Sequence, residues 1–488
     1  MQYHAFSVKS RCITLTCIRA PMNGLEAHRP PAPRRYDLPR SATRFSIDKT
    51  RRRLQNHWHN SGLRVLEMKQ VNIGLVGFGT VGGGLYRLLA ENGELIRARA
   101  GIDARIKTVC DLDVARVKSA TEGVDVTADY RTILADKEID LVVELIGGIE
   151  PAKTIIADAL RAGKHAVTAN KKLLAEAGDE IFALAAAGPA RLGFEAAVGG
   201  GIPCILALRQ GLVGNRVLSV MGILNGTTNY ILTRMREEHL SFETALADAQ
   251  RKGFAEADPT FDIEGFDAGH KIAILAMLAY GMKIDYRALS IEGITKIRAL
   301  DMEFAREMGY VIKLLGIAKL VDGKVDIRVH PTMLPLRHPL ASVQNEFNAV
   351  MFTNDMTGPV TLHGKGAGSL PTASAVASDI VEITKGSGGD PVRFSGSAAY
   401  VGPGARLSRY YMRVHTEDRH GILSKIAGAL AAHSISIASV IQKESETQHV
   451  PLIIMTHRVT EADMLAAAGE ISGFDFVEGS ATLIRVED

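Results

Sequence analysis

The fold is decided by the stretch Val71-Asn72-Ile73-Gly74-Leu75-Val76-Gly77-Phe78-Gly79-Thr80-Val81-Gly82. Its first half is an apolar run that ends in glycine, which is typical of a buried parallel strand. Its second half matches the pattern G-x-G-x-x-G, and the segment Gly82–Asn92 that follows has leucines at helical spacing. Because the loop joins a strand to a helix N-terminus, it predicts a site for the pyrophosphate of a dinucleotide. We therefore expect Gly77, Phe78, Gly79, Thr80, Val81 and Gly82 to bind such a cofactor.

Candidate strands and helices continue to alternate beyond this unit. Apolar runs at Ile106–Cys110, Leu141–Ile146 and Ala166–Thr168 are expected to be strands, and Pro151–Arg161 is expected to be a helix. Alternation of this kind is typical of a doubly wound parallel sheet with helices on both faces. The first domain is therefore predicted to be a Rossmann-type α/β domain.

The middle of the chain has a different pattern. Strand-like stretches at Val217–Leu224, Val325–Leu334 and Ala349–Thr353 surround longer helices at Ala268–Ala279 and Ser374–Thr384. This mixture predicts an α+β domain built on a mixed sheet.

The C-terminal part follows a segment rich in Gly, Ser and Pro between Gly386 and Gly404, which is typical of a linker. A third domain of roughly 80 residues is expected after it. Its elements are strand Tyr410–Thr416, helix Gly421–Ala432, strand Ile435–Gln442, strand Val450–His457, helix Glu461–Gly469 and strand Ala481–Val486. The expected organisation is a basic extension at 1–67, a nucleotide-binding domain at 68–195, an α+β domain at 196–390, a linker at 391–408 and a small domain at 409–488.

Composition and charge exclude several classes of protein. The chain of 488 residues is 46% apolar, yet no apolar run reaches the roughly 18–20 residues needed to span a bilayer. The net charge of +3 is unevenly distributed, because residues 1–67 carry 13 Lys/Arg and 4 Asp/Glu while the rest is net acidic. An acidic body argues against nucleic-acid binding, for which a basic stripe is expected. The 4 cysteines show no zinc-ligand spacing and are too few for a disulfide framework, which favours a cytoplasmic location.

The basic extension at residues 1–67 lacks sustained apolar periodicity. We expect it to be disordered, or to result from a start codon placed too early, since Met68 is followed at once by a strand. An organellar transit peptide and a contact with an anionic partner are the alternatives.

The choice between NAD and NADP depends on residues after the second candidate strand. Asp111 ends that strand, where a carboxylate can accept hydrogen bonds from the ribose hydroxyls of NAD. Arg116 and Lys118 lie close by in the sequence and could instead serve the 2′-phosphate of NADP. Asp111 could also be a plain turn residue, so both cofactors remain candidates.

Three polar clusters follow candidate strands or begin helices. Thr168–Lys172 follows a strand end, where open α/β sheets bind ligands, so its Lys171 can reach the crevice unless it is a solvated lysine at a helix start. Asn225–Asn229 offers small donors for a substrate carboxylate or a nicotinamide, although a turn with a helix N-cap explains it equally well. The segment Gly253–Lys271 is the most unusual, because it holds five carboxylates within twelve residues.

Asp267 and Lys271 lie four residues apart at the end of that segment, so they share a helical face. An exposed pair of this kind would contribute only a few tenths of a kcal/mol. Because the following helix is apolar, we expect the pair to be buried. A lysine in a buried, acid-rich cleft is a candidate proton carrier, since desolvation brings its pKa toward neutrality. We also expect Lys171 and Lys271 to depress each other's pKa.

Together these clusters resemble homoserine dehydrogenase. The resemblance runs in order from Val71 to about Glu382, and the block Glu256–Lys271 is its most specific part. The other segments that carry it are Gly77–Gly82, Ala169–Lys171, Glu195–Pro203, Asn225–Asn229 and Gly364–Val376. The last domain resembles an ACT domain with βαββαβ order, with Asp418–Leu423 at the expected loop and His420 where the family usually has proline.

The resemblance implies oxidation of L-homoserine to L-aspartate 4-semialdehyde with NAD or NADP, or the reverse reaction, in threonine, methionine and isoleucine biosynthesis. Lys271 would transfer the proton at the alcohol or aldehyde oxygen. Lys171 would contact the same oxygen and the cofactor. The implied substrate-binding residues are Glu256 and Asp267 for the amino group, with Gly226 and Thr227 on the nicotinamide side.

The resemblance also implies a bound monovalent cation and a regulated oligomer. Glu195 and the backbone carbonyls of Val198, Gly200 and Ile202 match the family's cation site, and such an all-oxygen ligand set suits Na⁺. The ACT domain implies inhibition by threonine in a homodimer or homotetramer.

Other functions fit the residues less well. An aspartate-semialdehyde dehydrogenase needs an activated thiol, but Cys204 lies in an apolar run and is expected to be in the core. A fusion to aspartokinase is not expected, because only 67 residues precede the dehydrogenase segment. A non-catalytic nucleotide or amino-acid sensor would not need both lysines and the acidic segment, and a lack of homoserine-dependent cofactor reduction would favour it.

Overall fold

The computed structural model describes residues 68–443 and 448–487, which belong to one compact unit. The expectations about residues 1–67 lie outside these ranges. Within them, every helix is too short or too polar to cross a bilayer.

The first sheet has six parallel strands in the order β3-β2-β1-β4-β5-β6. The strands are β1 (Lys69–Val76), β2 (Ile102–Cys110), β3 (Asp125–Thr127), β4 (Leu141–Glu144), β5 (His165–Thr168) and β6 (Leu192–Gly193). The helices of this part are α2 (Thr80–Ala100), α3 (Val114–Ala120), α4 (Arg131–Ala135), α5 (Ala152–Arg161) and α6 (Lys171–Ala187). The strand order reverses between β1 and β4, which creates the crevice where such sheets bind ligands. The predicted Rossmann-type fold is confirmed.

Helix α2 is longer than the predicted segment Gly82–Asn92. It continues past Gly93 to Ala100, and the next residue, Gly101, caps it in the left-handed conformation (φ +69°). An internal glycine weakens a helix without ending it, because the backbone hydrogen bonds continue on both sides.

The second sheet begins with the strands of the middle segment, in the order β12-β11-β7-β9-β10. These are β7 (Val217–Ile223), β9 (Tyr310–Val321), β10 (Lys324–Pro335), β11 (Phe347–Asn354) and β12 (Gly358–Lys365), with the short β8 (Ser290–Ile291) beside β10. Its helices are α7 (Cys204–Leu206), α8 (Gly226–Glu238), α9 (Phe242–Arg251), α10 (Thr260–Ile263), α11 (Phe266–Tyr280), α12 (Ala299–Glu307) and α13 (Ser369–Lys385). The predicted mixed sheet is present. Strand β9 is absent from the predicted strands, because a continuous apolar run fits a buried helix equally well.

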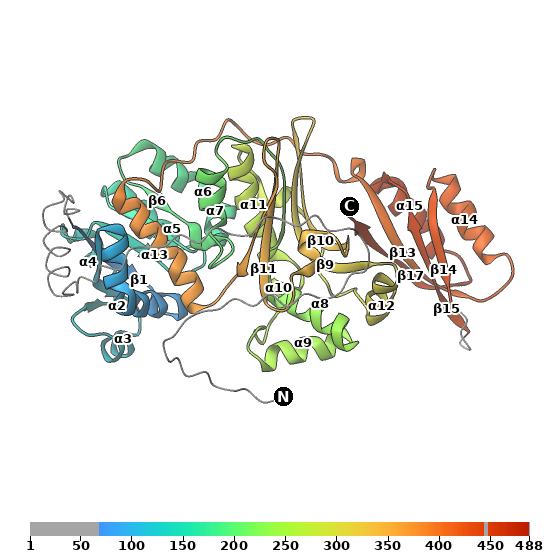
Figure 1. The fold of residues 1–488 in the computed structure, drawn as a ribbon, viewed down its shortest axis with the longest axis horizontal. Helices are drawn as coiled ribbons and strands as arrows, with labels where there is room; N and C mark the ends of the chain where they lie inside the picture. The colour runs from blue at the N-terminus through green and yellow to red at the C-terminus, as the bar shows by residue number, and fades with distance from the viewer. Residues whose placement is uncertain (1–67, 444–447, 488) are drawn as a thin grey trace, which may run out of the picture. The chain divides into compact units, whose positions relative to one another are not determined.

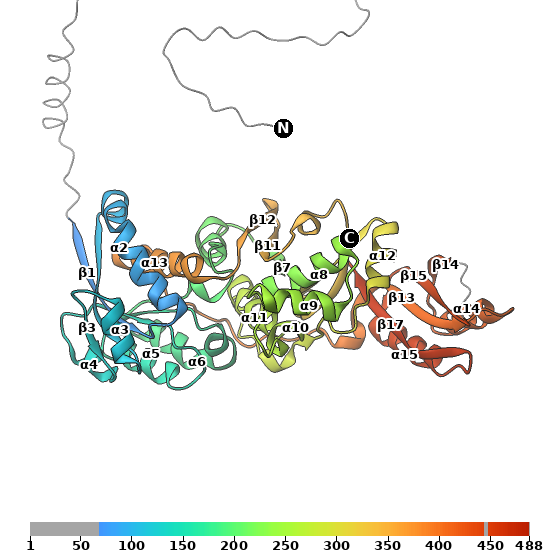
Figure 2. The same ribbon diagram turned by 90° about the horizontal axis from the view of Figure 1, so that it is seen from below.

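Helix α13 returns to the first sheet and lies along α2 in both views (Figures 1 and 2). Its buried Ala373, Val376 and Ile380 share one core with Ile73 and Leu85 of the nucleotide-binding segment. By packing, this helix therefore belongs to the first domain, although its sequence lies inside the segment 196–390.

The C-terminal segment has the βαββαβ order expected of an ACT domain. Its elements are β13 (Leu407–Glu417), α14 (Ile422–Ala432), β14 (Ile437–Gln442), β15 (His449–Thr456), β16 (Val459–Thr460), α15 (Glu461–Ser472) and β17 (Val477–Val486). Strand β17 also pairs with β10 in parallel, through Thr332 with Arg485 and Met333 with Val486. The two sheets are therefore one continuous sheet of eleven strands.

The segment predicted to be a linker is attached to the middle domain. Val325 at the start of β10 donates its backbone N–H to Ala399 and accepts from Val401. Arg406, near the end of the segment, is 6% exposed. The segment therefore joins the two domains by specific contacts.

Candidate active site

The glycine loop lies between β1 and α2, as the sequence predicts. Gly77 adopts φ +95°, and a Cβ on Gly82 would overlap the Gly77 carbonyl oxygen, whereas a Cβ on Gly79 would meet only open space. Helix α2 begins at Thr80 without a side-chain N-cap, so its first N–H groups remain available to an anion. The loop therefore fits the pyrophosphate of a dinucleotide.

Asp111 and Arg116 both contact this loop. The Asp111 carboxylate accepts hydrogen bonds from the N–H groups of Phe78 (2.7 Å) and Asp113 (2.9 Å). Burial opposes ionisation, but these hydrogen bonds and Arg116 lower the pKa of Asp111 overall. Arg116 donates to the Phe78 carbonyl (2.9 Å), and 48% of its side chain is exposed. Asp111 thus holds the loop, while Arg116 presents a cation beside it.

A cavity of about 280 Å³ continues from the glycine loop toward the middle domain. Thr80 and Val81 line one side of it, and Lys171 and Lys271 line another. A larger cavity of about 980 Å³ lies between α6 and residues 283–287, but it contains none of the predicted site residues. The smaller cavity brings the cofactor loop and both lysines together, which makes it the candidate active site.

Asp267 lies between the two lysines. Lys171, the first residue of α6, places Nζ 2.5 Å from Asp267 Oδ1, and Lys271 on α11 places Nζ 2.7 Å from Oδ2. Lys271 also donates to the Leu224 carbonyl oxygen (2.7 Å) at the end of β7. Lys271 and Asp267 are 7% and 2% exposed, while 36% of the Lys171 side chain is accessible. The predicted burial of the i, i+4 pair is confirmed.

The two lysines differ in their electrostatic surroundings. Burial and the nearby Lys171 cation lower the pKa of Lys271, although Asp267 opposes them. Burial also disfavours the Lys171 cation, but the charge of Asp267 outweighs it and raises the pKa of Lys171. Lys171 thus lowers the pKa of Lys271, as expected, whereas the net pKa of Lys171 itself is raised because it faces the Asp267 carboxylate directly.

The carboxylates of the acidic segment differ in their burial and in their hydrogen-bond partners. Asp262 accepts from Asn225 Nδ2 (2.8 Å) and lies 2.9 Å from the Thr227 hydroxyl. No Lys or Arg of the described residues forms an ion pair with Asp262, and burial together with Asp267 raises its pKa. Glu256 is exposed on the loop before α10. Asp262 was not among the predicted site residues, although its place inside the acidic segment was the available signal.

Gly226 and Thr227 are the first residues of helix α8 and lie beside the Asp262 carboxylate. Asn225 caps the helix by accepting from the Thr228 N–H (2.8 Å), and it also donates to Asp267 (2.9 Å). The sequence allowed either a turn with an N-cap or a polar binding loop at this position. The structure shows that the N-cap also contacts the acidic residues of the site.

The predicted cation ligands lie in one turn between β6 and α7. The Glu195 carboxylate accepts from the N–H groups of Ile205 (2.9 Å) and Leu206 (2.6 Å), yet burial raises the pKa of Glu195 to about 7. The Val198 carbonyl accepts from Cys204 Sγ, and the Ile202 carbonyl accepts from the Cys204 N–H. Gly200 lines the candidate active-site cavity. In the described residues, no cluster of three His, Cys, Asp or Glu side chains could hold a metal.

Cys204 itself is fully buried, and burial raises the pKa of its thiol. Such a thiol cannot serve as an exposed nucleophile. The expected core role of Cys204 agrees with this placement.

His270, the neighbour of Lys271 on α11, was not among the predicted site residues. Its ring stacks between Tyr286 (centroids 4.3 Å apart) and Phe261 (5.4 Å), and its Nε2 lies 2.6 Å from Glu176 Oε1. Burial lowers the pKa of His270, although Glu176 opposes this effect. Because Glu176 is on α6, the contact joins the two helices that carry the lysines.

The fold and the site define a nicotinamide-dependent oxidoreductase. Three family models match the chain: "Homoserine dehydrogenase, NAD binding domain" at residues 77–195, "Homoserine dehydrogenase" at 203–381 and "ACT domain" at 410–473. A homoserine dehydrogenase of Neisseria gonorrhoeae is 44% identical over 431 residues, covering 86% of this chain and 99% of the relative. The crystal structure of one from Thiobacillus denitrificans is 42% identical with a TM-score of 0.81, covering 86% and 99%.

An archaeal homoserine dehydrogenase in complex with NADPH covers 66% of this chain and 99% of its own, at 28% identity and a TM-score of 0.55. The chain belongs to the homoserine dehydrogenase family. It is an NAD(P)-dependent oxidoreductase with a C-terminal ACT domain.

Proposed function

We propose that the enzyme interconverts L-homoserine and L-aspartate 4-semialdehyde, with Lys271 as the proton carrier and Lys171 as the cation that stabilises the reacting oxygen. The observation that carries this proposal is the Lys171–Asp267–Lys271 cluster beside the cofactor loop. A bound nicotinamide ring supplies the acceptor for the hydride of the alcohol carbon.

In the oxidation direction, Lys271 takes the hydroxyl proton as the C–O bond becomes a carbonyl. Burial favours its neutral form, which is the form that can accept this proton. Lys171 keeps its charge because Asp267 faces it, so it stabilises negative charge on the same oxygen. In the reverse direction, the Lys271 ammonium returns the proton to the alkoxide.

The substrate ammonium requires a carboxylate that no cation already neutralises. Asp267 was expected to take this role, but its two oxygens face the two lysines. Asp262 lies in the same cluster, is half-buried and has no ion pair among the described side chains. We therefore assign the ammonium to Asp262 and Glu256, and the substrate carboxylate to the N–H groups of Gly226 and Thr227 at the start of α8.

Steady-state kinetics with purified protein tests this proposal. Homoserine-dependent reduction of NAD or NADP is expected for the wild type, and Asp262→Asn is expected to raise KM for homoserine more than KM for the cofactor. A wild-type protein without homoserine-dependent turnover would refute the proposed function and favour a nucleotide-binding sensor.

We infer that NADP is accepted at least as well as NAD. Each carboxylate oxygen of Asp111 already accepts one backbone N–H, from Phe78 and from Asp113, which reduces its capacity to accept ribose hydroxyls. Arg116 offers an exposed guanidinium at the same place, where a 2′-phosphate would gain a charged partner.

We also propose a Na⁺ site at Glu195 with the carbonyls of Val198, Gly200 and Ile202. The Asp379 carboxylate accepts from the backbone N–H of Glu195 (2.8 Å), so the two acidic residues are neighbours, and burial raises the pKa of both carboxyl groups. A cation would relieve this cost, and an all-oxygen donor set suits Na⁺. Replacing Na⁺ by choline at constant ionic strength is expected to lower activity, and equal rates in both salts would refute the site.

The ACT domain supports a proposal of inhibition by threonine in a cytoplasmic homodimer or homotetramer. The loop of Asp418, Arg419 and His420 between β13 and α14 lines an open hollow of about 570 Å³, where we place the effector. Inhibition kinetics with threonine, together with mass measurement by light scattering, tests both parts. A threonine-insensitive monomer would contradict them.

A further inference from the structure

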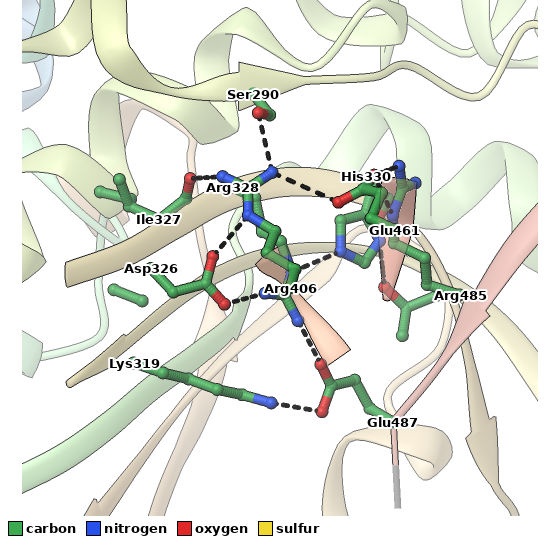
Figure 3. A network of polar contacts seen from close by, with 12 residues as sticks. Ser290, Lys319, Asp326, Ile327, Arg328, His330, Arg406, Glu461, Arg485 and Glu487 are labelled. Atoms are coloured by element: carbon green, nitrogen blue, oxygen red, sulfur yellow. Dashed lines mark hydrogen bonds and ion pairs between the residues drawn. The ribbon is translucent and has the colours of Figure 1, made fainter. Parts of the chain in front are cut away.

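A buried cluster of charged residues joins the ACT domain to the middle domain (Figure 3). We call it the junction cluster, and it consists of Lys319, Asp326, Arg328, His330, Arg406, Glu461, Arg485 and Glu487. Arg406 Nε lies 2.8 Å from Asp326 Oδ1, and Glu487 lies 2.7 Å from Arg328 and 2.6 Å from Lys319. Because Arg328 and Glu487 are buried, their ion pair across the two domains leaves an uncompensated charge if either partner is removed.

The cluster extends to a short segment of the middle domain, Ser290–Ile294. Arg406 donates to Ser290 Oγ (2.9 Å), and Arg485 lies 2.8 Å from Glu292 Oε2 while also pairing with Glu461. Ser290 and Ile291 form β8 beside β10, and the Glu292 N–H donates to the Val329 carbonyl (2.8 Å). Two arginines of the C-terminal part therefore hold one side of this segment.

The other side of the segment packs on the turn before α11. The Ile294 N–H donates to the Ile263 carbonyl oxygen (2.8 Å), and a Cβ on Gly293 would overlap that oxygen. Gly265 has φ +86°, and a Cβ there would lie 3.3 Å from Ile291 Cγ2 and 3.1 Å from Val329 Cγ1. The contact has no spare room, so a displacement of the segment must move the turn as well.

This turn carries two carboxylates of the candidate site: Asp262, to which we assign the substrate ammonium, and Asp267, which pairs with both lysines. Asp262 lies next to Ile263, and Asp267 lies two residues after Gly265, in the first turn of α11. The path from Arg485 to the site thus consists of one ion pair, one short segment and one tightly packed turn.

We propose that Arg485, through Glu292, is a positioning residue of the reaction, by which the ACT domain sets the place of the acidic turn. This inference rests on the proposed assignment of Asp262 and Asp267 to the site. The ACT domain then helps to hold the active site in place. A substitution at its contact with Glu292 should therefore affect homoserine binding more than cofactor binding.

The test compares Glu292→Gln and Arg485→Gln with the control Lys443→Gln. Lys443 also joins the two domains, through Glu303 (3.1 Å) and Glu307 (2.6 Å) on α12, but it does not touch the segment 290–294. Glu292→Gln and Arg485→Gln are each expected to raise KM for homoserine by about three- to tenfold, with KM for NAD(P) unchanged. Lys443→Gln is expected to leave both constants at the wild-type values.

The double variant distinguishes positioning from general loss of stability. If Arg485 acts through Glu292, the double variant has the KM of the more affected single variant rather than the product of the two effects. An unchanged KM for homoserine in Glu292→Gln, or an equal rise in Lys443→Gln, would overturn the inference. Should Arg485→Gln fail to fold, Glu292→Gln alone still decides, because 35% of the Glu292 side chain is exposed. A wild type without homoserine turnover would instead refute the proposed function.

Discussion

The substitution Asp267→Asn addresses the electrostatic basis of the site most sharply. It keeps the size of the side chain and removes the charge that lies 2.5 Å from Lys171 and 2.7 Å from Lys271. Asn225, which donates to the same carboxylate, can remain hydrogen-bonded to the amide oxygen. The change therefore isolates the charge from the packing.

The magnitude follows from the burial of the Lys271–Asp267 pair. At 2.7 Å and an effective dielectric constant of about 20, the Coulomb attraction of the pair is roughly 6 kcal/mol before desolvation. Removing one partner of a buried pair costs about 3–5 kcal/mol in measured cases. Lys271 can avoid most of this cost by releasing its proton, and 1.36 kcal/mol corresponds to one pH unit. The pH at which Lys271 loses its proton is therefore expected to fall by about two units or more in the variant.

The sign of the effect depends on the direction of the reaction. Homoserine oxidation needs neutral Lys271, so the rising limb of its pH–rate profile moves to lower pH in the variant. Aldehyde reduction needs the Lys271 ammonium, so its falling limb also moves to lower pH, and the reduction rate at neutral pH falls. Both profiles are measured as kcat/KM against pH.

A matched control is Asp248→Asn on α9. Asp248 accepts from the Tyr230 hydroxyl (2.6 Å) and pairs with Lys252 (3.1 Å), and these contacts lower its pKa to about 2. This control is expected to lose stability and keep the wild-type pH limbs. If Asp267→Asn keeps the wild-type limbs as well, the reasoning about Lys271 is refuted.

Three further substitutions test other contacts. Arg116→Ala is expected to raise KM for NADP about tenfold and KM for NAD little, and equal effects would exclude a 2′-phosphate contact. Glu176→Gln keeps the size of the side chain but weakens the His270 contact that joins α6 to α11. We expect kcat to fall severalfold and KM for the cofactor to stay unchanged. An unaltered kcat would show that this contact does not position the lysines. Lys313→Met removes an amine whose pKa burial lowers to about 7. The unfolded chain keeps the proton of this amine up to about pH 10.4, whereas the folded chain releases it near pH 7. The free energy of unfolding of the wild type should therefore rise between pH 7 and 10, by up to 1.36 kcal/mol per pH unit more than that of the variant. Urea unfolding measures this difference, and parallel pH curves for the two proteins would contradict it.

Local patterns predicted the nucleotide-binding part well. The run Val71–Gly77 and the glycines that follow specify a strand, a turn and a helix start through contacts within a few residues. The pair Asp267 and Lys271 was also predictable, because both lie on one helix whose remaining residues are apolar.

Contacts between distant segments were not predictable in the same way. Arg406 lies in a segment with linker composition, yet it is buried against Asp326, eighty residues earlier in the chain. The pairing of β17 with β10 consists of only two residue pairs, and the sequence pattern of neither strand predicts it. The division of roles among the acidic residues likewise depends on which carboxylate faces Lys171, a residue of another helix.

The central claim is that Lys271 carries the proton of the reaction, and kcat for homoserine oxidation by Lys271→Met measures it most directly. General acid–base catalysis contributes about 10²–10⁴-fold, so kcat is expected to fall by that factor with KM for NADP unchanged. A Lys271→Met enzyme that keeps kcat within about threefold of the wild type would contradict the claim.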